Sequence, residues 1–429
     1  MEKVTLPKLG DVVEVRPKNI DEIFFEAVIV EINGENKNDP VLCDPDSFTY
    51  TVLYEDGQLE SNIWFLSMIC PSQRKVVYSD DILIVTDGHA CIYNQVFQAR
   101  LLAFRESLHI VQSAIIIKPD TRKTTLICAE TDLNENTEQS INFDYKLLAF
   151  EVDQALSLCL PVYALAYTKL YPEGEIVNSP RAKLVGMDNH DHCYVDAEKI
   201  KISILGAGGG SLPLALARKH PQKLEIEVVD ICENVITVAK DLFGASEVSK
   251  TESMSFLHQD GLEYVKNFDK TCLDILVVDV ADFSIRMDTD MELPPEEFVS
   301  EKFLSSAKEI IKPQGWIVVN VLANCKTLIS LTNRFVQMFP SVYICATDPN
   351  YVFFLSLLEP KSDSIGSTVV SEQMVYDWAT MFRYDLDLCH SVLEDVRRTK
   401  EHIQQDILLG WFDHKNFLEL LQSGRVAVI

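Results

Sequence analysis

Residues 199–230 read KIKISILGAGGGSLPLALARKHPQKLEIEVVD, and this stretch decides the fold. A short apolar run at 201–205 leads into the turn GAGGG, a helical pattern follows at 212–220, and a second apolar run begins at 224. Such a series of strand, glycine turn, helix and strand is typical of parallel strands joined by a crossover helix. The glycine turn is therefore expected at the carboxyl end of the first strand, where open α/β sheets bind their ligands.

The alternation of strands and helices continues toward the carboxyl terminus. We expect helices at 234–244, 261–266 and 300–311, and strands at 255–259, 273–280 and 316–322. The last two apolar runs, 341–347 and 350–358, are joined by so tight a connection that they must pair antiparallel. The sequence therefore predicts an α/β domain whose doubly wound, Rossmann-like parallel sheet ends in an antiparallel pair.

The amino-terminal region has a different texture. Short runs of alternating apolar and polar residues lie between 10 and 71, and Asn-Gly and Asp-Gly pairs at 33–34 and 56–57 mark turns. This pattern predicts a small all-β barrel. After it, we expect strands at 81–86 and 107–118 and a buried helix at 147–171.

We therefore expect four parts along the chain. They are a β-barrel at 1–75, an amino-terminal extension of the catalytic domain with strands and a helix at 76–185, the Rossmann-like domain at 186–360 and a helical carboxyl-terminal segment at 361–429.

Composition and charge narrow the function. Against 38 basic side chains the 429 residues carry 65 acidic ones, a formal net charge of −27. Such a surface repels phosphate backbones, so we expect no nucleic-acid partner. It attracts a basic protein or a cationic amine instead, although acidity also serves solubility alone.

Cysteine usage and hydrophobic patterning bear on the compartment. The 11 cysteines are scattered without a CxxC pair, which fits a reducing compartment rather than a disulfide framework or a structural zinc site. The amino terminus lacks the apolar core of a signal peptide, and the apolar stretch 147–171 contains Glu151, Asp153 and Pro161. We therefore expect a cytoplasmic or nuclear protein without a membrane span.

The glycine turn predicts a cofactor site. Gly206, Gly208 and Gly210 let the backbone turn sharply and let a cofactor lie against bare peptide. A dinucleotide fingerprint that begins at Gly206 would need glycine at position 211, but Ser211 stands there. The turn therefore fits S-adenosyl-L-methionine better than NAD.

Three acids stand at the ends of the next three strands. Asp230 is placed to accept bonds from both ribose hydroxyls, and Asp260 from the adenine amino group. Asp279 ends the following strand, beside the place where a reactive sulfonium would lie. Each acid alone is typical of a helix cap or a solvated turn, but together on one edge of a sheet they predict a nucleoside cofactor.

These residues also carry a family resemblance. The segments ILGAGGGSLPLALA at 204–217, HQDGLEYV at 258–265, PPEEFVSEKFL at 294–304 and IIKPQGWIVVNVL at 310–322 resemble class I S-adenosylmethionine-dependent methyltransferases of the spermidine-synthase-like branch. Within that branch they are most similar to the carboxyl-terminal domain of the elongation factor 1-alpha lysine and N-terminal methyltransferases. The resemblance covers roughly residues 98–360.

The resemblance implies a fold and a site. That family has a seven-stranded sheet with an antiparallel last strand, in agreement with the tight connection near residue 349. It implies that the three alternate glycines hold S-adenosyl-L-methionine, that Asp230 binds its ribose and Asp260 its adenine, and that Asp279 lines the methyl-transfer site. The expected activity is methylation of a lysine or amino-terminal amine of a protein substrate, which the acidic surface predicts to be basic.

Two other functions remain open. The aminopropyltransferases of the same branch resemble the chain at 279–282, DVAD, but they usually have an aspartate where Ser211 stands. A scaffold with a degenerate Rossmann-like domain is the third possibility, and the intact glycines and acids speak against it.

Amine chemistry suggests which acids act. An amine is protonated at neutral pH, so a carboxylate that stabilises the cation and takes its proton is useful. Asp279 is the first candidate for this catalytic role and Asp282 the second, although Asp282 is equally typical of a cap on the next turn. The loop that follows is rich in acids, and it either attracts a basic substrate or is a solvated surface. Its acids are Asp288, Asp290, Glu292, Glu296 and Glu297.

Two further motifs have weaker chemical content. The stretch DNHDHC at 188–193 crowds its potential ligands into consecutive positions, so we interpret it as a polar loop and expect no metal. The barrel resembles Tudor or Agenet-type modules, which bind methylated peptides in aromatic cages. Phe25 and Tyr54 occupy cage positions, with Phe24 and Trp64 in reserve.

The cage looks incomplete. Val13 and Val15 stand where the first strand of such a module usually has an aromatic residue. A packing role for the aromatic residues, or an unmethylated protein ligand, is therefore an equal alternative to a methylated peptide.

Overall fold

A computed structural model describes most of the chain in two compact units, Met1–Ala149 and Phe150–Ile429. The described residues are 8–16, 24–33, 49–54, 58–64, 68–69, 72–92, 95–107, 111–118, 141–160, 162–163, 199–219, 223–251, 254–268, 272–281, 291–347, 349–358 and 410–422.

The first unit begins with a five-stranded antiparallel sheet in the order β4-β3-β2-β1-β5. Its strands are β1 (Val12–Val15), β2 (Phe25–Asn33), β3 (Thr49–Tyr54), β4 (Leu59–Trp64) and β5 (Met68–Ile69). Strand β1 pairs with both β2 and β5, so the first strand in sequence lies inside the sheet. One face is apolar and buried, with Val13, Val15, Ile29 and Tyr50 in its core. The all-β character expected of the amino-terminal region is confirmed.

A second five-stranded antiparallel sheet completes this unit, in the order β10-β9-β8-β7-β6. Its strands are β6 (Lys75–Ser79), β7 (Leu83–Ile92), β8 (Gln95–Phe104), β9 (Val111–Ile117) and β10 (Phe143–Leu148). The two strands expected from the sequence correspond to β7 and β9. The other three carry polar residues within their apolar runs, which hid their period.

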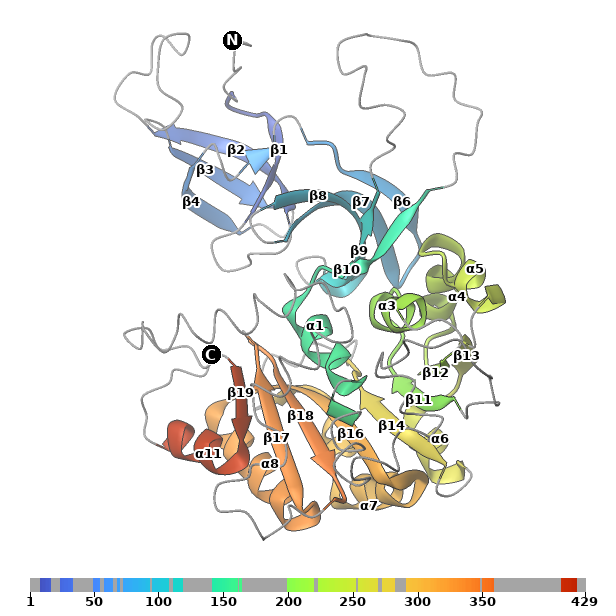
Figure 1. Ribbon diagram of the computed structural model, residues 1–429. Helices are drawn as coiled ribbons and strands as arrows, with labels where there is room; N and C mark the ends of the chain where they lie inside the picture. Colours follow the sequence, from blue (N-terminus) through green and yellow to red (C-terminus); the bar gives the residue numbers. More distant parts are fainter. Residues whose placement is uncertain are drawn as a thin grey trace, which may run out of the picture. The chain divides into compact units, whose positions relative to one another are not determined.

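The second unit is built on a mixed sheet in the order β13-β12-β11-β14-β16-β18-β17-β19, with β15 paired to β16 (Figure 1). The strands are β11 (Ile200–Leu205), β12 (Leu224–Asp230), β13 (Met254–His258), β14 (Leu273–Val278), β15 (Met291–Leu293), β16 (Ile311–Ala323), β17 (Ser341–Ala346), β18 (Tyr351–Ser356) and β19 (Gly410–Asp413). Strands β11 to β14 and β16 pair parallel, and β18 pairs antiparallel with β16 and β17. The expected Rossmann-like sheet with its antiparallel strand is confirmed. Among the described residues it has nine strands and not the seven expected, because β15 and β19 add to it.

Helices cover both faces of this sheet (Figure 1). The helices are α1 (Glu151–Ser157), α3 (Ser211–Lys219), α4 (Glu233–Leu242), α5 (Ala245–Thr251), α6 (Gly261–Asn267), α7 (Glu301–Ile310), α8 (Cys325–Met338) and α11 (His414–Gln422). Helix α1 packs against α3, which contacts α5, and α5 contacts α4. On the opposite face α6, α7, α8 and α11 share one hydrophobic core with the sheet.

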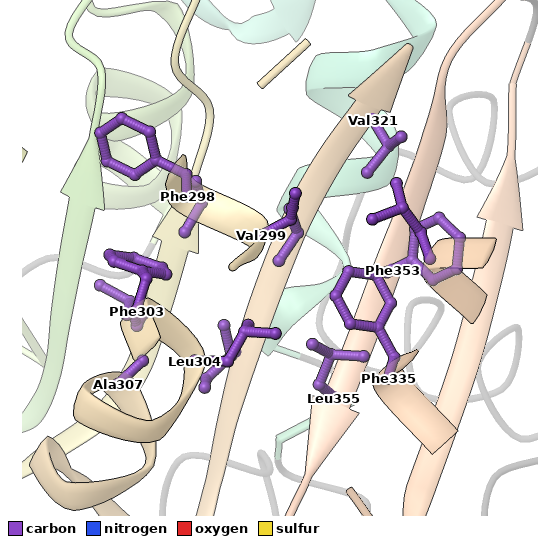
Figure 2. Packing of buried hydrophobic residues seen from close by; sticks show 14 of the residues in the cluster. Phe298, Val299, Phe303, Leu304, Ala307, Val321, Phe335, Phe353 and Leu355 are labelled. Carbon is purple, nitrogen blue, oxygen red and sulfur yellow. The ribbon is translucent and has the colours of Figure 1, made fainter. Parts of the chain in front are cut away.

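That core has an ordinary amphipathic origin. Helix α7 buries Phe303, Leu304, Ala307 and Ile310, which recur at the spacing of one helical face. Figure 2 shows Phe303, Leu304 and Ala307 in the same cluster as aromatic residues of α8 and β18. There Phe335 packs against Phe353 with ring centroids 5.0 Å apart. The core therefore fixes the strands whose carboxyl ends form the candidate site.

The described carboxyl-terminal residues add an element that the sequence did not suggest. Strand β19 pairs antiparallel with β17 and so extends the sheet at its edge, and α11 follows it directly. Phe417 of α11 is fully buried against Tyr351 and Phe353. Of the segment expected to be helical, this part contributes both a strand and a helix.

Among the described residues, no helix is long and apolar enough to cross a membrane.

Candidate functional site

The glycine turn follows β11 and presses against the end of β14. Gly206 has φ +97°, and a Cβ atom built there would lie 1.9 Å from the carbonyl oxygen of Asp279. The backbone nitrogen of Gly206 donates to Val229 O at 2.8 Å, and that of Asp279 donates to Leu205 O at 2.9 Å. Only glycine allows this approach, so the turn is clamped between the carboxyl ends of β12 and β14.

The other two predicted glycines complete the turn. Gly208 and Gly210 also have positive φ, +48° and +82°. The nitrogen of Gly210 donates to Ala207 O at 2.8 Å, and Gly210 O accepts the first helical bond from Leu214 at 3.0 Å. The turn thus leads directly into the amino terminus of α3, and helix amino termini favour an anionic ligand group.

Asp230, the last residue of β12, ties the turn to its own strand. Its two carboxylate oxygens accept bonds from the backbone nitrogens of Ala207 and Cys232, both at 2.8 Å. A carboxylate has about four acceptor positions, so two remain for hydroxyl groups of a ligand. Burial raises the pKa of Asp230, and the two backbone donors and the nearby His258 partly offset this rise. Asp230 is therefore both a structural clamp and an available acceptor.

Asp260 lies at the carboxyl end of the next strand along the edge. It is the N-cap of α6, where one carboxylate oxygen accepts from Leu262 N at 2.7 Å. The helix-cap role foreseen for any one of these acids is thus filled by Asp260. Its side chain is partly exposed, so its other oxygen is open to a ligand.

Asp279 is the site residue that depends most on its neighbours. It lies just beyond β14, partly buried, and accepts a bond from the amide of Asn320 at 2.9 Å. Asn320, on β16, in turn accepts from the amide of Asn350 at 2.9 Å. Burial raises the pKa of Asp279, and the Asn320 bond partly offsets that rise. A chain of two neutral amides therefore orients this carboxylate without neutralising it.

The structure adds one acid that sequence reasoning did not place in the site. Asp153 of α1 is buried, and its carboxylate accepts a bond from the hydroxyl of Ser211 at 2.8 Å. Burial and the nearby Asp279 carboxylate raise the pKa of Asp153 to about 7, against the lowering effect of Ser211. In the sequence, Asp153 signalled only a charge inside an apolar stretch, and that signal was used solely to exclude a membrane span.

The parallel register brings the predicted residues onto one edge. Leu205 is level with Val229 on one side and Val278 on the other, so Gly206, Asp230 and Asp279 follow side by side. Strand β13 continues the row toward Asp260. The edge therefore runs from Asp260 through Asp230 and the glycine turn to Asp279, the order in which an adenosine with an extended 5′ substituent can lie across it.

Several other expected residues fall outside this constellation. Asp282, Asp288 and Asp290 lie outside the described residues, as does the DNHDHC stretch at 188–193. Glu296 and Glu297 are exposed, in keeping with a solvated acidic loop. No group of three or more His, Cys, Asp or Glu side chains within the described ranges is arranged to hold a metal ion.

In the first unit, most of the aromatic residues expected to form a cage are buried or already bonded to neighbouring side chains. Phe24 and Phe25 are buried, at 3% and 8% exposure, and Phe24 contacts the ring of His89 edge-on. The hydroxyl of Tyr54 donates to Glu60 at 2.7 Å. The side chain of Trp64 lies outside the described part of the chain. Burial of the two phenylalanines favours the packing role over a methyl-ammonium cage.

The region that contains the site is similar to known proteins. The family model of the Spermine/spermidine synthase domain matches residues 183–352. The human eEF1A lysine and N-terminal methyltransferase is 29% identical over 153 residues, which are 34% of this chain and 21% of that protein. The spermine synthase of Saccharomyces cerevisiae is 22% identical over 171 residues, which are 38% of this chain and 54% of the yeast protein. The chain thus spans about a fifth of the human relative's length.

One solved structure that matches part of the chain is that of human methyltransferase-like protein 13 in complex with SAH. It has a TM-score of 0.41 and 21% sequence identity, and the match covers 55% of this chain and 92% of that one. The resemblance expected from the sequence motifs, to the spermidine-synthase-like branch and its elongation-factor methyltransferases, is confirmed by the family model and the human relative.

Proposed function

We propose that the chain is an S-adenosylmethionine-dependent methyltransferase that acts on an amine of a protein, a lysine side chain or an amino terminus. The observation that carries the proposal is the close approach of Gly206 to Asp279, which sets a bare glycine turn beside a row of acids at one sheet edge. The similarity to the human lysine and N-terminal methyltransferase supports an amine of a protein as the acceptor.

The residues present fit the cofactor. The bare turn at 206–210 accommodates a nucleoside close to the backbone, the free acceptor positions of Asp230 suit ribose hydroxyls, and Asp260 suits an adenine amino group. When bound, S-adenosylmethionine supplies an electrophilic methyl group on a sulfonium. The protein's own part is to align the acceptor amine with that group and to keep the amine neutral.

Asp279 is proposed to accept the proton that the substrate ammonium must lose. Its raised pKa brings the carboxylate closer to working pH, where a general base is most effective. Asn320 holds the carboxylate in one orientation through its bond to Oδ1. Asp282 remains a second candidate from the sequence, and the net charge of −27 favours a basic protein substrate.

The second candidate function is aminopropyl transfer to an amine. It is favoured by the Spermine/spermidine synthase family model, which matches the site region. Ser211 speaks against it, because the aminopropyltransferases that the chain resembles usually have aspartate there. In this structure the Ser211 hydroxyl is bonded to Asp153 instead.

Methyl transfer can be measured directly. The purified chain is incubated with a protein extract and S-adenosylmethionine labelled in its methyl group, and label is counted in protein. We expect incorporation that falls about 100-fold or more in Asp279→Asn, the scale of a lost general base. The matched control is Asp241→Asn, the same change at an exposed position of α4, which should keep full activity.

A parallel reaction with decarboxylated S-adenosylmethionine and a polyamine tests the second candidate. If an aminopropyl group is transferred and no methyl group is, the chain is an aminopropyltransferase. If Asp279→Asn methylates as fast as wild type, Asp279 has no catalytic role.

A further inference from the structure

Asp153 is a buried acid that neither the sequence motifs nor the proposed reaction uses. It is 6% exposed and lies on α1, a helix that packs against α3, β16 and β18. Its carboxylate accepts from the hydroxyl of Ser211, the residue that begins α3 directly after the glycine turn. Although 58 residues separate them in sequence, the two side chains meet at the turn.

The strand order tells which part of a cofactor lies beside Asp153. Adenine is expected at Asp260 and ribose at Asp230, so the rest of the cofactor extends past the glycine turn toward Asp279. The carboxylate of Asp153 accepts a bond from Ser211, the residue directly after the glycine turn, and it lies close enough to Asp279 to feel its charge. It therefore flanks the amino-acid end of S-adenosylmethionine and not its nucleoside end.

Among the described residues, no positive charge balances Asp153. The described groups that face it are the neutral hydroxyl of Ser211 from α3 and the carboxylate of Asp279 from the end of β14. Strand β16 contributes the neutral amide of Asn320 through Asp279. The lysine at the start of β16, Lys312, is bonded to Asp274 instead.

Strand β18, YVFFLS, has only Tyr351 as an ionisable residue, and its ring packs on Phe417. Across the described residues, neither Asp153 nor Asp279 has a salt bridge. Neutral donors stabilise a buried carboxylate anion less than a neighbouring positive charge does, so a cation would stabilise both groups further.

We propose that Asp153 binds the ammonium group of the methyl donor's amino-acid part, and that Ser211 positions its carboxylate for this contact. The inference rests on the proposed function, because it takes the methyl donor to lie across the edge as described. The ammonium group of the ligand then supplies the positive charge that balances the Asp153 carboxylate. Asp153 becomes the residue that separates donors with an amino-acid part from nucleosides that lack one.

Proton release is a consequence of this arrangement. Because burial raises its pKa to about 7, Asp153 is partly protonated at neutral pH in the free protein. A bound ammonium stabilises the anion and lowers that pKa, so binding should release a fraction of a proton at pH 7. A nucleoside without an ammonium group should release much less.

Calorimetry of two ligands on the full chain tests the proposal. S-adenosylhomocysteine carries the ammonium group, and 5′-methylthioadenosine is the same nucleoside thioether without the amino-acid part. We expect Asp153→Asn to weaken S-adenosylhomocysteine about tenfold or more, the scale of a lost charged contact, and to change 5′-methylthioadenosine less than threefold. Asp241→Asn, an exposed acid on α4, should change neither.

Proton release is read from the same titrations in two buffers of different ionisation enthalpy. The wild type should release protons with S-adenosylhomocysteine at pH 7, and Asp153→Asn should not. This readout of the wild type stands even if the variant folds poorly.

The outcomes separate the two claims. If the folded wild type binds neither ligand, the proposed function fails and this inference with it. If it binds S-adenosylhomocysteine without proton release, or if Asp153→Asn weakens both ligands equally, the cofactor site stands and the role of Asp153 is wrong.

Discussion

Strand β14 has one acid near its amino end, Asp274, and another directly after its carboxyl end, Asp279. The two carboxylates differ in the hydrogen-bond and charge partners that the described residues give them. At the amino end, Asp274 is fully buried and its carboxylate accepts from the hydroxyl of Tyr163 at 2.5 Å, from the backbone nitrogen of Lys201 at 3.0 Å and from Lys312 Nζ at 3.1 Å. The protein supplies both the hydrogen bonds and the positive charge. The Asp274 carboxylate therefore has hydrogen-bond donors and a countercharge without any ligand.

At the carboxyl end, Asp279 and Asp153 receive bonds only from neutral donors within the described part of the chain. Asn320 donates to one and Ser211 to the other, and burial raises the pKa of both carboxyls. A protein does not hold two such groups close together for stability, because each opposes the ionisation of the other. The missing countercharge among the described residues, rather than burial itself, is therefore the feature that supports the proposed binding of a cationic group at this edge.

The largest effect on stability is expected from removing Asp274, the carboxylate whose hydrogen bonds and countercharge both come from the protein. Asp274→Ala leaves the ammonium of Lys312 and the hydroxyl of Tyr163 without their shared acceptor, and should lower the free energy of unfolding by about 3–5 kcal/mol. Urea denaturation of the full chain measures this. A loss below about 1 kcal/mol would remove the contrast between the two ends.

A smaller but still large effect is expected at the glycine turn. Gly206→Ala combines a left-handed backbone with a clash against Asp279 O, and should cost about 2–4 kcal/mol and weaken S-adenosylhomocysteine at least about tenfold. Gly10→Ala is the matched control, since Gly10 has φ +87° but nothing within 4 Å of the added Cβ. It should cost only about 1–2 kcal/mol. Equal costs would mean that the close approach to β14 is not needed.

The buried carboxyl of Asp153 should also make the free energy of unfolding depend on pH. Because folding raises the pKa of Asp153 from 3.8 to about 7, the folded state holds the proton longer than the unfolded state. Stability therefore falls as pH rises between these values, by about 4 kcal/mol at most for this group.

Asp153→Asn removes that loss. Thermal unfolding without ligand should show that its stability advantage over wild type is about 2–3 kcal/mol larger at pH 8 than at pH 5. Asp241→Asn corrects for the change in net charge. A variant that is destabilised at both pH values would give Asp153 a structural role instead.

The smallest effect concerns the amide chain. Asn320→Ala removes the donor that lowers the pKa of Asp279, so this pKa should rise further. Because the proposed base acts unprotonated, the acidic limb of the rate profile should move to higher pH, by up to about one unit. Asn350→Ala, one bond further away, should shift it less. An unchanged pH profile in both variants would mean that the protonation of Asp279 does not control the rate.

Sequence reasoning reached the fold of the second unit because the signals there are local. Glycines at 206, 208 and 210, each with positive φ in the structure, end a five-residue apolar run, and the acids stand at the next strand ends. The antiparallel β17–β18 pair followed from a connection too short to cross over. Such patterns need no knowledge of distant contacts.

What the sequence did not reveal depends on long-range contacts. Asp153 joins the site through a residue 58 positions away, and Asp274 receives the hydroxyl of Tyr163 from 111 positions away. Asn320 sits inside the strand WIVVNVL, where its polarity gave no hint that it faces Asp279. Strand β19 pairs with β17 across more than sixty residues of chain, so no local pattern could place it in the sheet.

The carboxyl edge of the second unit's sheet is proposed to bind a methyl-donor nucleoside. Calorimetric titration of S-adenosylhomocysteine into the wild type and Asp230→Ala measures this binding. We predict micromolar binding by the wild type and a loss of about tenfold to 100-fold in the variant, since the ribose acceptor and the clamp on Ala207 are both removed. Absence of binding by the folded wild type, or equal binding by the variant, would contradict the account.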